Sequence, residues 1–177
     1  MMRRLFATAL FSTLLVGPGA RASTPDDAWV AKFVARIATP AVYEVKPRTV
    51  IGYFDGVLHL HAVGDRSCPR SFEATDKWPT LTFSWFSFAD AKTCDASPLG
   101  NIKIDLTGED APKVVPMLEA LGRRLGKPTI ERVIAETNVG ETIWGTRTRG
   151  VGVEYDAGNP RGYTVWVFGP GGTSGRS

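Results

Sequence analysis

Residues 142–168 read TIWGTRTRGVGVEYDAGNPRGYTVWVF, and this stretch decides the fold class. In 151–155 and again in 163–167 every second residue is apolar, which is the period of a β-strand that is half buried in a sheet. Residues 156–162, between these two runs, are rich in Asp, Asn, Gly and Pro and therefore predict a turn. The stretch predicts consecutive strands around 142–146, 151–155 and 163–167.

The same two-residue period extends toward the N-terminus. It predicts strands around 79–89, 102–106 and 130–137. Residues 48–64 add a β-hairpin prediction, because Asp55-Gly56 separates two apolar runs and this dipeptide is typical of a two-residue turn. We therefore expect a mostly antiparallel sheet.

Two segments have the three- and four-residue spacing of amphipathic helices. The first begins around Thr24-Pro25 and ends near Pro40, with an apolar stripe that comprises Trp29, Val30, Phe33, Val34 and Ile37. The second covers 111–125 and is stopped by Gly126; Pro116 fits it only if the regular helix begins close to that residue. The fold class expected is α+β, with two helices packed on the sheet in one domain of residues 23–168 and a Gly-rich flexible tail at 169–177.

The N-terminal 22 residues have the features of a secretory signal peptide. Arg3 and Arg4 precede an apolar run at 5–16, and the small residues Ala20 and Ala22 precede a cleavage site after Ala22. The apolar run is too short to cross a bilayer, and no later stretch comes close to the length required, so no membrane span is expected. Short, Arg-led signals of this kind are typical of bacteria, so the expected location is the periplasm or the medium.

Charge gives no support for nucleic-acid binding. Removing Arg3, Arg4 and Arg21 with the signal from the 21 basic residues leaves 18, which equals the 18 acidic residues. Phosphate backbones are bound by clustered excess Lys and Arg, so a mature chain without net charge does not predict a nucleic-acid partner.

Both cysteines, Cys68 and Cys94, belong to the mature chain. In an oxidising compartment, two cysteines at moderate separation predict one disulfide. A loop of that length would contribute about 3–4 kcal/mol on the chain-entropy view.

Motifs for catalysis are weak. His59 and His61 are the only histidines, and on a strand two residues apart share a face, so they could hold one zinc ion if the fold supplied a third ligand. The sequence has no G-x-S-x-G nucleophile motif and no glycine-rich loop that opens a helix. No other cofactor is predicted.

Aromatic residues are the most suggestive feature. In 163–168, Tyr163 belongs to one face of the strand, and Trp166 and Phe168 belong to the other. Two helices can cover one sheet face but hardly two, so either loops complete the cover or one face binds a partner. The candidate binding residues are Trp144, Trp166 and Phe168 with Arg147 and Arg149 in the neighbouring turn, since Trp and Arg are enriched at interfaces.

These observations lead to two hypotheses. The first is a small exported binding protein, such as an inhibitor, an immunity-type protein or an accessory protein. It would contact another exported or envelope protein, or cell-wall carbohydrate, through an aromatic sheet surface. The second is a small periplasmic metal-assisted hydrolase centred on His59 and His61.

Overall fold

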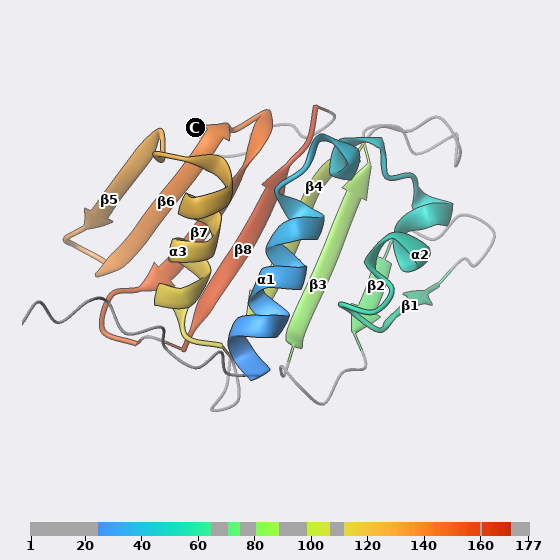
Figure 1. Cartoon of the computed structure of the whole chain (residues 1–177), viewed down its shortest axis with the longest axis horizontal. Coiled ribbons are helices and arrows are strands. Elements are labelled where there is room, and N and C mark those ends of the chain that lie inside the picture. Colours follow the sequence, from blue (N-terminus) through green and yellow to red (C-terminus); the bar gives the residue numbers. More distant parts are fainter. Residues whose placement is uncertain are drawn as a thin grey trace, which may run out of the picture.

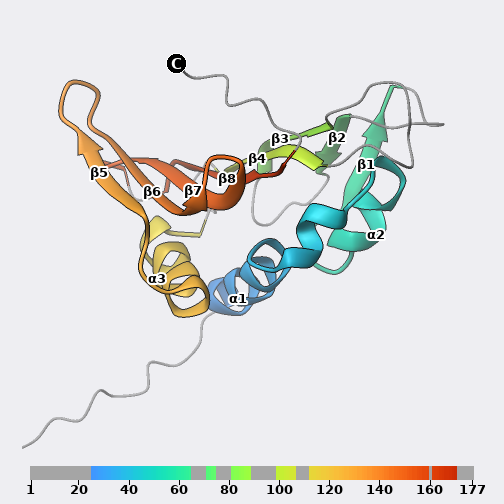
Figure 2. The ribbon, with the colours of Figure 1, turned by 90° about the horizontal axis from the view of Figure 1, so that it is seen from above.

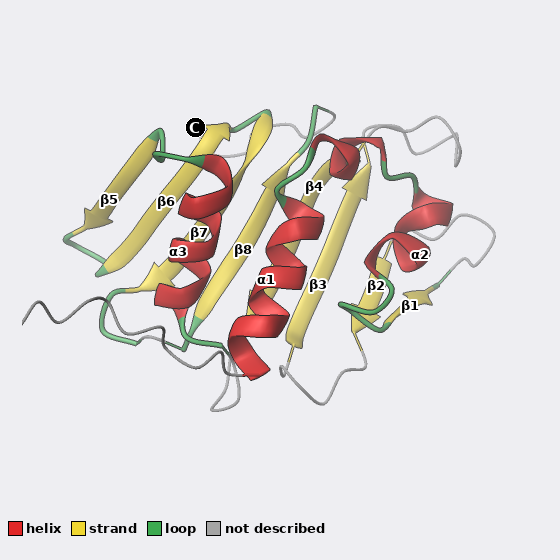
Figure 3. Ribbon diagram, viewed as in Figure 1, coloured by secondary structure: helices red, strands yellow, loops and turns green. Residues whose placement is uncertain are grey.

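The computed structural model describes residues 25–64, 71–74, 81–88, 99–106, 112–159 and 161–170. Helices and strands of this part are coloured in Figure 3. The helices are α1 (Pro25–Ile37), the 3-10 helices η1 (Pro40–Glu44) and η2 (Pro47–Thr49), α2 (Val50–Phe54) and α3 (Val114–Leu125). The strands are β1 (Leu60–Val63), β2 (Ser71–Ala74), β3 (Leu81–Phe88), β4 (Leu99–Leu106), β5 (Ile130–Ile134), β6 (Val139–Thr146), β7 (Arg149–Asp156) and β8 (Tyr163–Phe168).

All eight described strands form one antiparallel sheet in the order β1-β2-β3-β4-β8-β7-β6-β5 (Figure 1). The sheet consists of two meanders, β1–β4 and β5–β8, in which each strand pairs with the next one in the sequence. The meanders meet where β4 pairs with β8, from Asn101 opposite Phe168 to Leu106 opposite Tyr163. The α+β class and the antiparallel sheet expected from the sequence are confirmed.

The two long helices lie side by side on one face of this sheet (Figure 2). Their core-facing residues are buried: Phe33 and Ile37 of α1 and Met117 and Leu121 of α3 have no exposed surface. These side chains form one core cluster with alternate residues of the central strands: Ile102, Ile104, Leu106, Val151, Val153, Tyr163, Val165 and Val167. The core therefore lies between α1, α3 and the strands at the meeting point of the two meanders.

Sequence patterns placed both long helices correctly. The first ends at Ile37, two residues before Thr39-Pro40. The second begins at Val114, so that Pro116 lies in its first turn, where a missing N–H breaks no helical hydrogen bond. Gly126 follows the second helix with a φ of 83°, a backbone conformation that glycine adopts at little cost.

The β-hairpin expected at 48–64 is wrong. Its first half forms η2 and α2, and only Leu60–Val63 is a strand. Val50 and Phe54 are four residues apart and both fully buried, so helical spacing buries them as well as strand spacing would. Asp55 and Gly56 end α2: the amide groups of Val57 and Leu58 both donate to the carbonyl of Phe54.

Several expectations lie outside the described residues. These are the signal peptide at 1–22, Cys68 and Cys94 with their disulfide, and nearly all of the tail at 169–177. None of the described helices has the length and apolar character needed to cross a membrane.

Candidate functional site

The sheet face opposite α1 and α3, called the open face here, carries Trp166 and Phe168. Val165 and Val167 belong to the core under the helices, and side chains alternate along a strand, so their neighbours Trp166 and Phe168 point away from the helices. Both rings are half-buried; their centroids are 6.2 Å apart and their planes differ by 5°. Figure 2 shows no described helix on this side of the sheet.

Phe168 rests on a glycine of the neighbouring strand. A Cβ at Gly152 of β7 would lie 3.0 Å from Cε2 and 3.3 Å from Cζ of Phe168, and 3.5 Å from Ile143 of β6. Ile143 is 1% exposed and does not belong to the core cluster under the helices. The open face therefore has a small apolar centre of its own, formed by Phe168, Gly152 and Ile143.

Polar side chains of β4 form a network beside the aromatic pair of β8. The Lys103 ammonium lies 5.6 Å from the centroid of the Trp166 ring and 2.9 Å from a carboxylate oxygen of Asp105. The Thr164 hydroxyl donates a 2.5 Å hydrogen bond to the other oxygen of Asp105. Lys103 thus joins a cation-π contact to an ion pair, which fixes Asp105 and Thr164 beside Trp166.

A second charged group lies on the same open face, on the β5–β6 side of the aromatic pair. The Glu141 carboxylate accepts hydrogen bonds from Nε of Arg132 on one oxygen and from Arg147 on the other, both at 2.8 Å. The Glu141 side chain is only 15% exposed, whereas the Arg132 side chain is 54% and the Arg147 side chain 37% exposed. One carboxylate with two guanidinium groups leaves this group with net positive charge.

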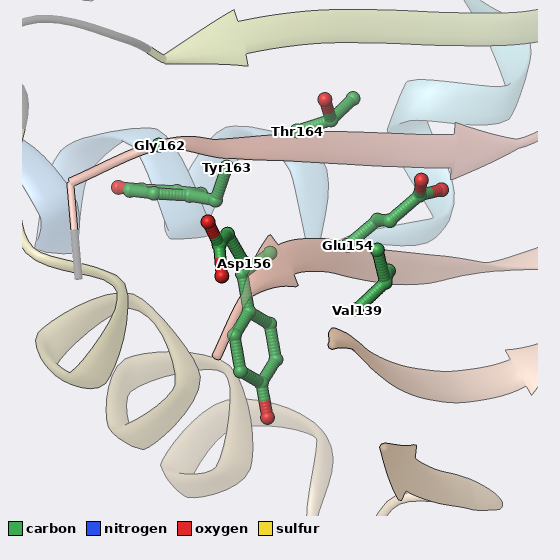
Figure 4. A pocket seen from close by; sticks show the side chains of 7 residues that line it. Val139, Glu154, Asp156, Gly162, Tyr163 and Thr164 are labelled. Carbon is green, nitrogen blue, oxygen red and sulfur yellow. The ribbon is translucent and has the colours of Figure 1, made fainter. Parts of the chain in front are cut away.

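A shallow depression of about 310 Å³ lies at the end of β7 and the start of β8 (Figure 4). Glu154, Asp156 and Thr164 line it, together with Val139, Tyr155, Gly162 and Tyr163. Asp156 accepts hydrogen bonds from the Asn138 amide at 3.1 Å and from the Gly158 backbone N–H at 2.8 Å, so it also holds the turns at this end of the sheet.

The five binding residues expected from the sequence do not share a face. Trp166, Phe168 and the guanidinium of Arg147 belong to the open face. Trp144 is 4% exposed on the helix side, where its indole N–H donates to the Gly126 carbonyl at 2.9 Å.

Arg149 likewise lies on the helix side, with its guanidinium carbon 5.0 Å from the centroid of the Tyr43 ring. Burial raises the pKa of Tyr43, and the charge of Arg149 partly offsets that rise. Trp144 and Arg149 therefore contribute to the fold and not to the open face.

Sequence reasoning missed most polar residues of the open face. Lys103 and Asp105 alternate with Ile102, Ile104 and Leu106, and this pattern marks them as the residues opposite the core. No sequence pattern indicated that they would lie beside Trp166, because β4 and β8 are far apart in the chain.

The histidines lie at the far end of the sheet. His59 precedes β1, and His61 is a β1 residue, so they do not lie on one strand as expected. Both are exposed, and Nε2 of His61 is 3.3 Å from a Glu73 carboxylate oxygen. Within the described ranges, no group of three or more His, Cys, Asp or Glu side chains is arranged to hold a metal ion.

Comparisons of the chain with protein-family models, with curated proteins and with solved structures found no match.

Proposed function

We propose that the protein is a small exported binding protein that contacts another exported or envelope molecule through its open face. One observation carries the proposal: the half-buried rings of Trp166 and Phe168 alternate with the core residues Val165 and Val167 and therefore lie on the sheet face opposite both long helices. A sheet face of a monomer that is left to water normally carries polar side chains, whereas a large aromatic pair on such a face is typical of an interface.

The surroundings of the pair support the same proposal. Arg147 and Arg132 are held by Glu141 on one side, and Lys103 is held by Asp105 on the other. Aromatic residues at the centre with ordered charged groups around them are the usual composition of a binding surface. An inhibitor, an immunity-type protein or an accessory subunit would use such a surface without any catalytic group.

Site-specific photo-crosslinking tests this proposal. A benzophenone amino acid replaces Trp166 in one variant and Ile51, an exposed residue of α2, in the control. We expect irradiation of producing cells to give a discrete adduct from position 166 and none from position 51. The partner identified from the adduct should then lose affinity for Trp166→Ala and Phe168→Ala. Equal labelling at both positions, or no adduct at 166, would contradict the proposal.

A metal-assisted hydrolase is the alternative, and the contact between His61 and Glu73 is the observation that favours it, since imidazole and carboxylate are both zinc ligands. Elemental analysis of protein purified without a histidine tag decides the question. A stoichiometric metal that is lost in the His59→Ala/His61→Ala variant would favour the hydrolase over the binding protein.

A further inference from the structure

Exposed large apolar residues gather at one end of the molecule. Among the described residues six such side chains are exposed, and four of them belong to α3 and β5: Val115 (54% exposed), Leu125 (38%), Val133 (57%) and Ile134 (36%). Ile134 follows Val133 on β5 and points to the open face, so three of the four lie on the helix side of the sheet. Single exposed apolar residues are common, but several on adjacent elements mark an interaction surface.

The apolar residues of α3 form a second stripe beside its core stripe. Val115, Leu118 and Leu125 are spaced by three and seven residues and therefore lie along one side of the helix. Val115 and Leu125 are exposed, and Leu118 between them is half-buried against the edge of the core. Arg124 lies on the opposite flank of the core stripe, where its Nε donates at 3.5 Å to the carbonyl of Ala38, directly after α1. The second stripe therefore points away from α1, toward the β5 edge of the sheet.

Val133 lies on the same side of the sheet as α3. It pairs with Gly140 of β6, and a Cβ at Gly140 would lie 2.2 Å from Cζ of Tyr155, so the Tyr155 ring covers this glycine. Tyr155 packs against the core under the helices. The second stripe of α3, Tyr155 and Val133 thus face the same side, and we call Val115, Leu118, Leu125 and Val133 the α3–β5 patch.

The sheet is wide enough for one more helix beside β5 than the described residues supply. Strands lie about 4.8 Å apart and packed helices about 10 Å apart, so an eight-stranded sheet takes roughly four helix positions on one face. In Figure 2, α2, α1 and α3 lie beneath the sheet from β1 toward β6, and no described helix lies beneath β5. On the opposite edge, α2 packs beside β1. No helix among the described residues covers the β5 edge in this way.

We propose that the α3–β5 patch binds one amphipathic helix of a partner protein, which takes the fourth helix position beside α3. A helix that matches α3 in length has about twelve residues, or roughly 18 Å. Its apolar stripe contacts Val115, Leu125 and Val133. Glu131, exposed on the same side of β5 as Val133, pairs with a Lys or Arg on the rim of that helix.

This surface is on the helix side of the sheet and is independent of the open face, so the inference goes beyond the proposed function. The probe is a synthetic peptide of residues 25–38 (PDDAWVAKFVARIA), the amphipathic segment that packs against the other side of α3 and carries Lys32 and Arg36 on its polar face. It is titrated into the isotope-labelled mature protein and followed by amide chemical shifts.

We expect saturable shifts in 115–125 and 130–134 with a dissociation constant of about 0.1–1 mM. Val133→Lys and Leu125→Lys should each weaken binding by about tenfold or more. Ile51→Lys, at a similarly exposed site on α2, should leave it unchanged, and Glu131→Lys should weaken it mainly at low salt.

Three results would overturn the inference. The first is an absence of saturable shifts at about 1 mM peptide. The second is shifts confined to 164–168, which would place the helix on the open face. The third is concentration-dependent dimerisation that Val133→Lys abolishes, which would make a second copy the occupant. Crosslinking at Trp166 is read separately, so the proposed function stands or falls without this result.

Discussion

The hairpin between β6 and β7 should not tolerate a side chain at Gly150. A Cβ built at Gly150 lies 2.3 Å from the Trp144 carbonyl oxygen and 2.6 Å from the Thr146 carbonyl oxygen. Both contacts are to backbone atoms and are about 1 Å shorter than the van der Waals distance. The backbone of the hairpin must therefore move apart to accommodate the alanine of Gly150→Ala. Overpacking of this kind costs about 1–3 kcal/mol, and we expect the upper end because no flexible side chain can move aside.

Urea unfolding of the mature protein measures this cost, and thermal unfolding gives a second value. For a chain of this size, a loss of about 3 kcal/mol corresponds to a decrease of roughly 6–12 °C in Tm. Gly122→Ala in α3 is the matched control, since a Cβ there has nothing within 4 Å. Because alanine favours helix over glycine, the control should gain up to about 1 kcal/mol.

A Gly150→Ala variant whose free energy of unfolding stays within about 1 kcal/mol of the parent, with the control behaving as expected, would refute the argument from close backbone approach. A decrease in both variants would point to a general sensitivity of the chain to alanine and not to this hairpin.

Three further changes test other contacts. Trp144→Phe removes the N–H that donates to Gly126 and should cost about 1 kcal/mol in urea unfolding. Glu141→Gln takes the negative charge from between Arg132 and Arg147; it should destabilise by about 1 kcal/mol at low salt and by less at 1 M salt. Burial raises the pKa of Tyr43 above its ordinary 10.0, so the folded state holds this proton more tightly than the unfolded state. The corresponding stability is complete below about pH 10 and is lost as pH rises further, and Tyr43→Phe should reduce that loss in unfolding measured between about pH 9 and 11.

Local patterns were enough to predict the long helices and most strands. The stripe of α1 and the Gly126 stop of α3 are local signals, and each corresponds to an observed helix boundary. Local patterns failed at α2. The buried residues there are Val50, Phe54, Val57 and Leu58, and their spacing is compatible with either a helix or a strand. Contacts with a segment distant in sequence accompany the helix: the indole N–H of Trp29 in α1 donates to the Val57 carbonyl at 3.0 Å.

The candidate site could be predicted only in part. Alternation along β8 separated Trp166 and Phe168 from Tyr163, and the structure places them on opposite faces. Trp144 was grouped with them by residue type, but its position on β6 directs it to α3. Which side chains lie opposite each other on neighbouring strands depends on the register of pairing. Lys103 lies opposite Trp166 because β4 pairs with β8, and no local sequence pattern predicts the pairing of these two distant strands.

The pairing of β4 with β8 has a consequence for how the chain reaches this structure. It is the one contact between neighbouring described strands that are not consecutive in sequence. Closing the roughly 60 residues between Leu106 and Tyr163 costs about 1.6 kcal/mol more than closing a ten-residue hairpin. Within each meander, strands that are consecutive in sequence can pair one after another. The pairing of β4 with β8 instead requires two distant segments of the chain to meet. The slow step of folding should therefore be the docking of two preformed half-sheets, and substitutions that weaken β4–β8 pairing should retard refolding more than those at the outer strands.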